Sequence, residues 1–223
     1  MSEKKVMDLV KVIMIYLCYF TYSQIITFIF RCLKVNNDIS SIIADLVFLV
    51  IIIFAYKNRI KDAFLDIKKK KISQVIKKIF IWFIIIFLFN AIMGAITEAI
   101  LPEIASVKDS NTEAIYKLSL YRVIFKTMIF SIFAEELLFR ETLSKIIKND
   151  FIFIIITSLV YASVSILYTY NLSNYPVFDF ITYFLPALIF STAYVKNNRN
   201  IIIIMIIKLI LQMISLSYLL ISS

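Results

Sequence analysis

Three charged residues in the apolar stretch Phe133–Arg140 have the types and spacing needed for chemistry: Glu135, Glu136 and Arg140. At 100° per residue of an α-helix, Glu136 and Arg140 lie one turn apart on one face, in the favourable acid-before-base order. A charged side chain at membrane depth costs about 2.5–3.5 kcal/mol, so such groups normally face a protein interior and mark a functional site. We therefore expect one helix to present a compact acidic site with its own cation. The alternative is a pair of interfacial charges that snorkel to the head groups at a helix end.

The composition of the chain is that of a membrane protein. Hydrophobic residues make up 61% of the 223 residues, charged residues only 17%, and the mean hydropathy is +0.90. A soluble domain is far less apolar. The net charge of +9 comes from basic residues beside apolar segments, which is typical of topology signals. We therefore expect membrane lipid, in particular anionic lipid, as the counterion, and no nucleic-acid partner.

Seven apolar segments predict an all-α bundle of about seven transmembrane helices. Each segment approaches or exceeds the length needed to cross the hydrocarbon core. The chain shows no internal repeat and no linker, so we expect one integral membrane domain over residues 1–223. The segments are Val12–Phe30, Ile39–Tyr56, Ile79–Leu101, Leu118–Phe139, Phe151–Tyr170, Pro176–Val195 and Ile201–Ile221.

The loop Lys57–Lys78 carries the strongest topology signal, with nine Lys or Arg against two Asp. The positive-inside rule places this loop in the cytoplasm, where we expect a solvated, partly amphipathic segment. A cytoplasmic N-terminus then puts sixteen Lys and Arg inside and four outside. This balance predicts a multi-pass protein of the cell membrane, with the acidic pair near the cytoplasmic end of the fourth helix.

The pattern Glu135-Glu136-x-x-x-Arg140 resembles the first motif of the CAAX protease and bacteriocin-processing (CPBP, or Abi) family of intramembrane endopeptidases. The resemblance extends over residues 118–221. It implies that Glu135 is the general base that activates water. It also implies two further motifs, an aromatic residue followed by a His four positions later, and His-x-x-x-Asn on a last helix. Some members of the family are bacteriocin self-immunity proteins.

The chain departs from the family in the later motifs. In Tyr161-Ala-Ser-Val-Ser165, Ser165 stands where the His belongs, and in Lys208-Leu-Ile-Leu-Gln212, Lys and Gln replace His and Asn. The chain contains no His at all. The resemblance thus implies a site with both motif histidines missing. Its residues are Glu135, Glu136, Arg140, Ser165, Lys208 and Gln212.

The residue types of this site limit its chemistry. A catalytic zinc needs about three protein ligands, and two glutamates alone would hold it poorly, so we expect neither a tightly bound metal nor another cofactor. If Arg140 pairs with Glu136, Lys208 is free to pair with Glu135. An ion pair with Lys208 would make Glu135 a weaker base. We expect Glu135, Glu136, Ser165 and Lys208 to surround one cavity open toward the cytoplasmic side, because each is too polar to face lipid.

Two functions of different classes follow. The first is a degenerate family member that binds a peptide, a bacteriocin or a membrane-protein partner without cleaving it, as an immunity protein or scaffold would. The alternative is an active glutamate-dependent endopeptidase in which Glu135 activates water and Ser165, Gln212 or Lys208 stabilises the oxyanion. A Ser165–Lys208 dyad is a third, weaker candidate for hydrolysis.

Charged residues elsewhere in the apolar segments have a structural interpretation. Asp45 and Glu98 are candidate partners for Arg122 or Lys126 within the bundle. The alternative is a polar pathway lined by these carboxylates, as in a transporter.

Overall fold

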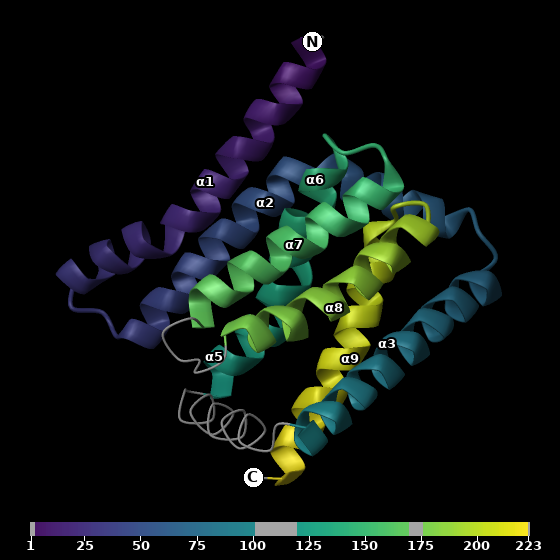
Figure 1. The fold of residues 1–223 in the computed structure, drawn as a ribbon. Helices are drawn as coiled ribbons and strands as arrows, with labels where there is room; N and C mark the ends of the chain where they lie inside the picture. The colour runs from purple at the N-terminus through teal and green to yellow at the C-terminus, as the bar shows by residue number, and fades with distance from the viewer. Residues whose placement is uncertain (1–2, 101–119, 170–175, 223) are drawn as a thin grey trace.

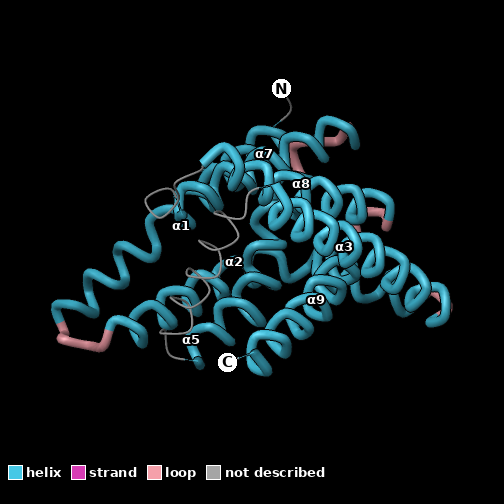
Figure 2. Tube along the Cα trace, turned by 60° about the horizontal axis from the view of Figure 1, so that its bottom comes forward, coloured by secondary structure: helices cyan, strands magenta, loops and turns pink. Residues whose placement is uncertain are grey.

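All regular structure in the computed structural model is helical over the residues that it describes, which are 3–100, 120–169 and 176–222 (Figure 1 and Figure 2). The prediction of an all-α fold is therefore confirmed. The six long helices are α1 (Glu3–Cys32), α2 (Asn37–Lys68), α3 (Ile72–Ile100), α7 (Asp150–Thr169), α8 (Pro176–Lys196) and α9 (Ile201–Ser222). Between α3 and α7 lies a further helical segment, composed of α5 (Leu120–Ile124), η1 (Phe125–Glu135), η2 (Leu137–Glu141) and α6 (Thr142–Ser144).

Six helices in the described ranges are long and apolar enough to cross a membrane, namely α1, α2, α3, α7, α8 and α9. The segment Leu120–Ser144, which we call the central segment, is the fourth of the seven predicted helices. It contains Arg122, Lys126, Glu135, Glu136, Arg140 and Glu141, and it alternates between α-helical and π-helical turns. The fold is that of a multi-pass membrane protein.

The predicted basic loop Lys57–Lys78 is mostly helical, which corrects the sequence analysis. Helix α2 continues to Lys68 and α3 begins at Ile72, so only residues 69–71 connect them. At 1.5 Å per residue, α2 is about 48 Å long, well beyond the hydrocarbon core of about 30 Å. Its basic last turns therefore extend into the head-group region, where Lys and Arg are solvated and favour a helix. Residues 101–119 and 170–175, which include the connections between the third and fourth and between the fifth and sixth predicted segments, lie outside the described residues.

Asparagine side chains fix the starts of three helices. Asn36 accepts a hydrogen bond from the backbone N–H of Asp38 at 2.7 Å, and Asn149 accepts one from Ile152 at 3.0 Å. Such caps satisfy backbone donors that the first helical turn leaves unpaired. Asn200 caps α9 through the N–H of Ile202 at 3.1 Å and also donates to the Ala63 carbonyl of α2 at 2.9 Å. The start of α9 is thus tied to α2, and this sets the depth of the polar residues on α9.

The central segment lies inside the bundle. It packs against α2 on one side and α9 on the other, while α7 and α8 pack along each other and α3 packs along α9. Its ends, labelled α5 and α6, lie at opposite ends of the bundle in Figure 1. Phe130, Leu137 and Leu138 are fully buried and Phe139 nearly so. Charged residues on this segment are therefore held in the protein interior.

Candidate functional site

Glu136 lies at the centre of a buried cluster of charges. Its side chain is 1% exposed, and one carboxylate oxygen accepts a hydrogen bond from Arg140 one turn further along the central segment. The other oxygen lies 3.0 Å from the Lys208 ammonium of α9. Arg140 is equally buried, and its guanidinium lies 5.2 Å from the centre of the Phe190 ring. The pair predicted from the spacing of Glu136 and Arg140 is present in the structure.

Lys208 joins both glutamates. Its Nζ lies 3.2 Å from Glu135 Oε2 and 3.0 Å from Glu136 Oε1, and it also donates to the backbone carbonyl of Ser131 at 3.0 Å. The predicted contact between Lys208 and Glu135 is therefore present, with Glu136 as an additional partner. Two carboxylates face two cations, Lys208 and Arg140. This balance offsets part of the desolvation cost of each charge.

Ser131 belongs to the same group, although we did not predict it as a site residue. Its Oγ donates a hydrogen bond to Glu135 Oε2 at 2.9 Å. The sequence contains a signal for this contact, since Ser131 lies four residues before Glu135 on the same helical face. The side chain of Glu135 is 19% exposed, against 1% for Glu136. Of the two glutamates, Glu135 is the one accessible to a ligand.

The glutamates lie where the two π-helical stretches meet, with Glu135 ending η1 and Leu137 beginning η2. The hydroxyl of Thr142 donates to the carbonyl of Leu137, five residues earlier, at 2.9 Å. π-Helical turns are rare and often accompany functional sites. The sequence analysis assumed regular α-helical turns, so this feature was missed.

A cavity of about 560 Å³ borders the cluster. Glu135, Ser165 and Gln212 line it, together with Ser131 and Tyr161. Glu136, Arg140 and Lys208 are not among its lining residues. The prediction that four polar residues surround one cavity therefore holds for Glu135 and Ser165 only, because Lys208 is drawn away from the cavity into its contacts with the carboxylates.

The lining residues show in which direction the cavity extends from Glu135. From Glu135 it extends to Asp45, Arg122 and Lys126, which lie near the starts of α2 and the central segment. This is the end of the bundle opposite to the basic residues 57–78, which the charge rule assigns to the cytoplasm. On the other side of Glu135, residues 136–144 are buried.

Ion pairs line the far part of this cavity. Lys126 Nζ lies 3.1 Å from both carboxylate oxygens of Asp45, and the Tyr22 hydroxyl donates to Asp45 at 2.6 Å. Arg122 pairs with Asp38 at 2.7 Å. The predicted partnership of Asp45 with Lys126 is present, whereas Glu98 pairs with neither predicted cation within the described residues.

The side chains at the site do not fit a metal ion. In the described parts of the chain, no three His, Cys, Asp or Glu residues lie close enough together to hold one. Zinc sites in proteins use three or four such ligands. In addition, the Lys208 ammonium lies between the two carboxylates and would repel a metal cation.

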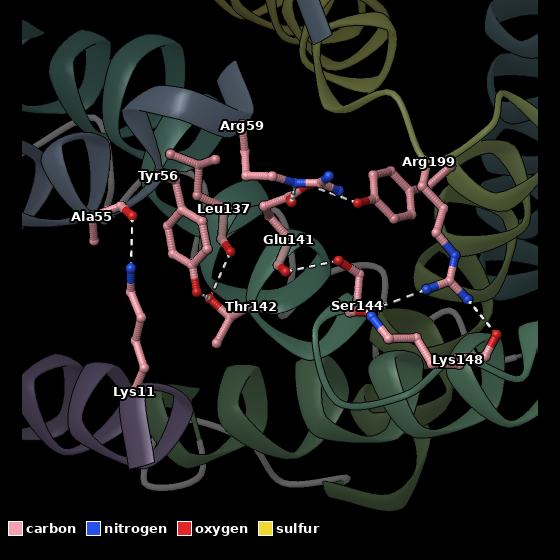
Figure 3. Close-up of polar contacts among 11 residues, drawn as sticks. Lys11, Ala55, Tyr56, Arg59, Leu137, Glu141, Thr142, Ser144, Lys148 and Arg199 are labelled. Atoms are coloured by element: carbon pink, nitrogen blue, oxygen red, sulfur yellow. Dashed lines mark hydrogen bonds and ion pairs between the residues drawn. The ribbon is translucent and has the colours of Figure 1, made fainter. Parts of the chain in front are cut away.

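A second buried carboxylate follows on the next turn of the central segment. Glu141 is 2% exposed and accepts a hydrogen bond from Arg59 Nε of α2 at 2.6 Å (Figure 3). It accepts a second hydrogen bond from the Tyr194 hydroxyl of α8 at 2.8 Å. Beside it, the Tyr56 hydroxyl donates to Thr142 at 2.8 Å. The sequence analysis missed this group because its partners lie 82 and 53 residues away in the chain.

A comparison with models of known protein families matches part of the chain. Residues 117–214 match the family model described as Rce1-like, type II CAAX prenyl endopeptidase Rce1-like. No curated protein and no solved structure matches the chain. The matched range runs from the central segment into α9 and contains all six predicted site residues. The resemblance found in the motifs is thereby confirmed, and the protein is a multi-pass membrane protein related to the CPBP-family endopeptidases through residues 117–214.

Proposed function

We propose that this protein binds a peptide, or a segment of a partner membrane protein, without hydrolysing it, and that it acts in the cell membrane as an immunity protein or scaffold. The observation that carries this proposal is the contact of the Lys208 ammonium with both glutamates. A general base must accept a proton from water at a free carboxylate lone pair, and Glu135 Oε2 already accepts hydrogen bonds from Lys208 and Ser131. Lys208 stands where the related motif carries a histidine, and its ammonium occupies the side of Glu135 Oε2 that a water molecule would otherwise approach.

The cavity supports a binding role. Its volume of about 560 Å³ lies within the range of ligand pockets in proteins, about 300–1,000 Å³. Its wall includes carboxylates of Glu135 and Asp45 and cations of Arg122 and Lys126. A peptide inside a membrane protein must have its backbone N–H and C=O groups hydrogen-bonded. A wall that carries both acceptors and donors meets this requirement.

The loss of both imidazoles also favours binding over hydrolysis. Ser165 and Gln212 line the cavity at two of the positions where the related motifs carry His and Asn. A hydroxyl and an amide donate hydrogen bonds to a peptide carbonyl but do not exchange protons near neutral pH. These residues can therefore hold a peptide bond without taking part in proton transfer.

The second candidate function is a glutamate-dependent endopeptidase, and the accessibility of Glu135 favours it. Glu135 is 19% exposed and lines the cavity, where a water molecule and a peptide bond can meet it. In that reaction, Glu135 takes a proton from water as the water oxygen adds to the peptide carbonyl carbon. Ser165 or Gln212 stabilises the oxyanion, and the C–N bond breaks as the amine receives the proton.

A single assay separates the two functions. The purified protein in liposomes is mixed with two quenched fluorescent peptides, one a farnesylated Cys-aliphatic-aliphatic-X peptide and the other a cationic amphipathic peptide. We expect saturable binding of at least one peptide and no cleavage above a Glu135→Gln control. Cleavage that Glu135→Gln abolishes, with an unchanged melting temperature, would establish the endopeptidase instead.

Matched substitutions on α7 test whether the cavity is the binding site. Ser165→Trp fills the cavity, whereas Ser163→Trp adds the same side chain at an exposed position of the same helix. We expect at least a tenfold loss of peptide binding for Ser165→Trp only. Equal losses in both variants, or no saturable binding of either peptide to the unmodified protein, contradict the proposal.

A further inference from the structure

Two ammonium groups lie over one tyrosine ring at the end of the bundle that carries α6. Lys145 Nζ is 4.4 Å and Lys11 Nζ is 5.3 Å from the centre of the Tyr56 ring. Lys11 also donates to the Ala55 carbonyl at 2.9 Å (Figure 3). Within the described residues, neither lysine forms an ion pair with a carboxylate, in contrast to Lys126 and Lys208. The site therefore holds excess positive charge.

The pKa of Lys145 is consistent with this excess of positive charge. Burial lowers the pKa of Lys145, and the neighbouring Lys11 ammonium lowers it further. The carboxylates of Asp8 and Glu141 act in the opposite direction, but the net shift is downward. The free protein thus brings two like charges together at an energetic cost. An anion bound between the two ammonium groups would remove their repulsion.

An apolar groove begins at Lys11. It has a volume of about 280 Å³ and lies between α1 and α2. Apart from Lys11, all of its lining residues are apolar: Met14, Ile15, Cys18, Phe48, Ile51 and Ile52. A long, apolar ligand with a negatively charged head fits this combination of groove and cations.

The position of the lysines in the fold identifies the ligand class. Lys145 follows α6 at the turn into α7, where the chain leaves the bundle, so it lies at the level of lipid head groups. From Lys11, the groove runs along α1 and α2 toward the bilayer interior. We propose that this site binds one anionic phospholipid, with its phosphate between Lys11 and Lys145 and an acyl chain in the groove. Basic pockets between membrane helices are known to select such lipids.

The test measures lipid selectivity. The protein is reconstituted in bilayers of equal amounts of phosphatidylglycerol and phosphatidylcholine, and the lipids retained after gentle detergent extraction are counted by native mass spectrometry. We expect preferential retention of one phosphatidylglycerol. Lys11→Met and Lys145→Met should each reduce this preference about fivefold. The matched control, Lys61→Met with Lys77→Met, removes two exposed lysines outside the site and should leave it unchanged.

A matched pair of substitutions on α2 tests whether the groove holds an acyl chain. Ile51→Trp fills the groove, whereas Ile53→Trp places the same side chain on the same helix outside it. Only Ile51→Trp should weaken retention. A melting assay in detergent distinguishes binding of a lipid from binding of a free anion. Short-chain phosphatidylglycerol should raise the melting temperature, and inorganic phosphate should not.

Three results overturn the proposal. They are equal retention of the two lipids by the unmodified protein, equal effects of the site and control lysines, and equal stabilisation by inorganic phosphate. The first result requires no variant, so misfolding of a substituted protein does not prevent the test. Lys11→Arg with Lys145→Arg preserves both charges and should preserve the selectivity.

Discussion

Two buried glutamates on neighbouring turns of the central segment have their negative charges stabilised in different ways. Glu136 is held by two cations, Arg140 and Lys208, whose side chains are 2% and 9% exposed. Glu141 is held by one cation, Arg59, whose side chain is 50% exposed, and by a neutral hydroxyl. The first cluster is closed within the protein, whereas the second opens to the surroundings through its arginine.

The difference shows what each cluster contributes. An exposed arginine keeps much of its hydration, so the Glu141 group joins α2, the central segment and α8 at a modest electrostatic cost. The Glu136 group places four charges in the interior beside a cavity, and it persists only because each charge has a partner. Removal of Glu136 or of Lys208 should therefore cost more than removal of Glu141.

The largest effect is expected for Glu136→Gln. This substitution leaves Arg140 buried without its carboxylate and removes one of the two carboxylates of Lys208. An uncompensated buried charge typically costs about 3–5 kcal/mol. Reversible unfolding in mixed detergent micelles should show a loss of this size. A loss below about 1 kcal/mol would mean that solvent reaches Arg140 and that the cluster is not closed.

Lys208→Met should cost somewhat less, because Glu136 retains Arg140 and Glu135 retains the Ser131 hydroxyl. We expect a loss of about 2–3 kcal/mol, as for charge-assisted hydrogen bonds. The double variant Glu135→Gln with Lys208→Met should recover much of this loss, since no unpaired charge remains. The matched double variant Glu136→Gln with Lys208→Met should not recover it, because Arg140 stays unpaired. Equal stabilities of the two double variants would contradict this assignment of partners.

Glu141→Gln should have a smaller effect than either change. The amide can still accept a hydrogen bond from Tyr194, and Arg59 can turn toward solvent. Because the arginine of this ion pair is half-exposed, we expect a loss of about 1 kcal/mol in the same unfolding assay. A loss equal to that of Glu136→Gln would show that the two clusters do not differ in the way described above.

Short-range contacts of the site were predictable from sequence. The spacing of Glu136 and Arg140 fixes their contact because residues four apart share a helical face. Lys208 was predicted to reach Glu135 because an ammonium two turns into an apolar helix needs an anion. Ser131 follows the same spacing rule and was overlooked.

Other features depend on packing between distant parts of the chain. Arg59 of α2 and Tyr194 of α8 both contact Glu141, and nothing in the sequence around either residue indicates that partner. The π-helical turns and the direction of the cavity likewise depend on which helices surround the central segment. The extension of α2 to Lys68 was missed for another reason, since charge marks the end of the hydrocarbon layer but not the end of a helix.

The smallest effect on stability is expected for Glu135→Gln, the substitution that tests the function most directly. Glu135 is partly exposed at the cavity, and the glutamine oxygen can still accept the Ser131 hydrogen bond. Lys208 keeps Glu136 as its partner, so the loss should stay below about 1 kcal/mol, the net contribution of a typical hydrogen bond. Charge at the cavity wall nevertheless changes from negative to neutral. Binding of a cationic peptide in liposomes should therefore weaken while the melting temperature stays within a few degrees of the unmodified value. If binding is unchanged and stability falls as far as in Glu136→Gln, Glu135 belongs to the closed cluster and not to the ligand site.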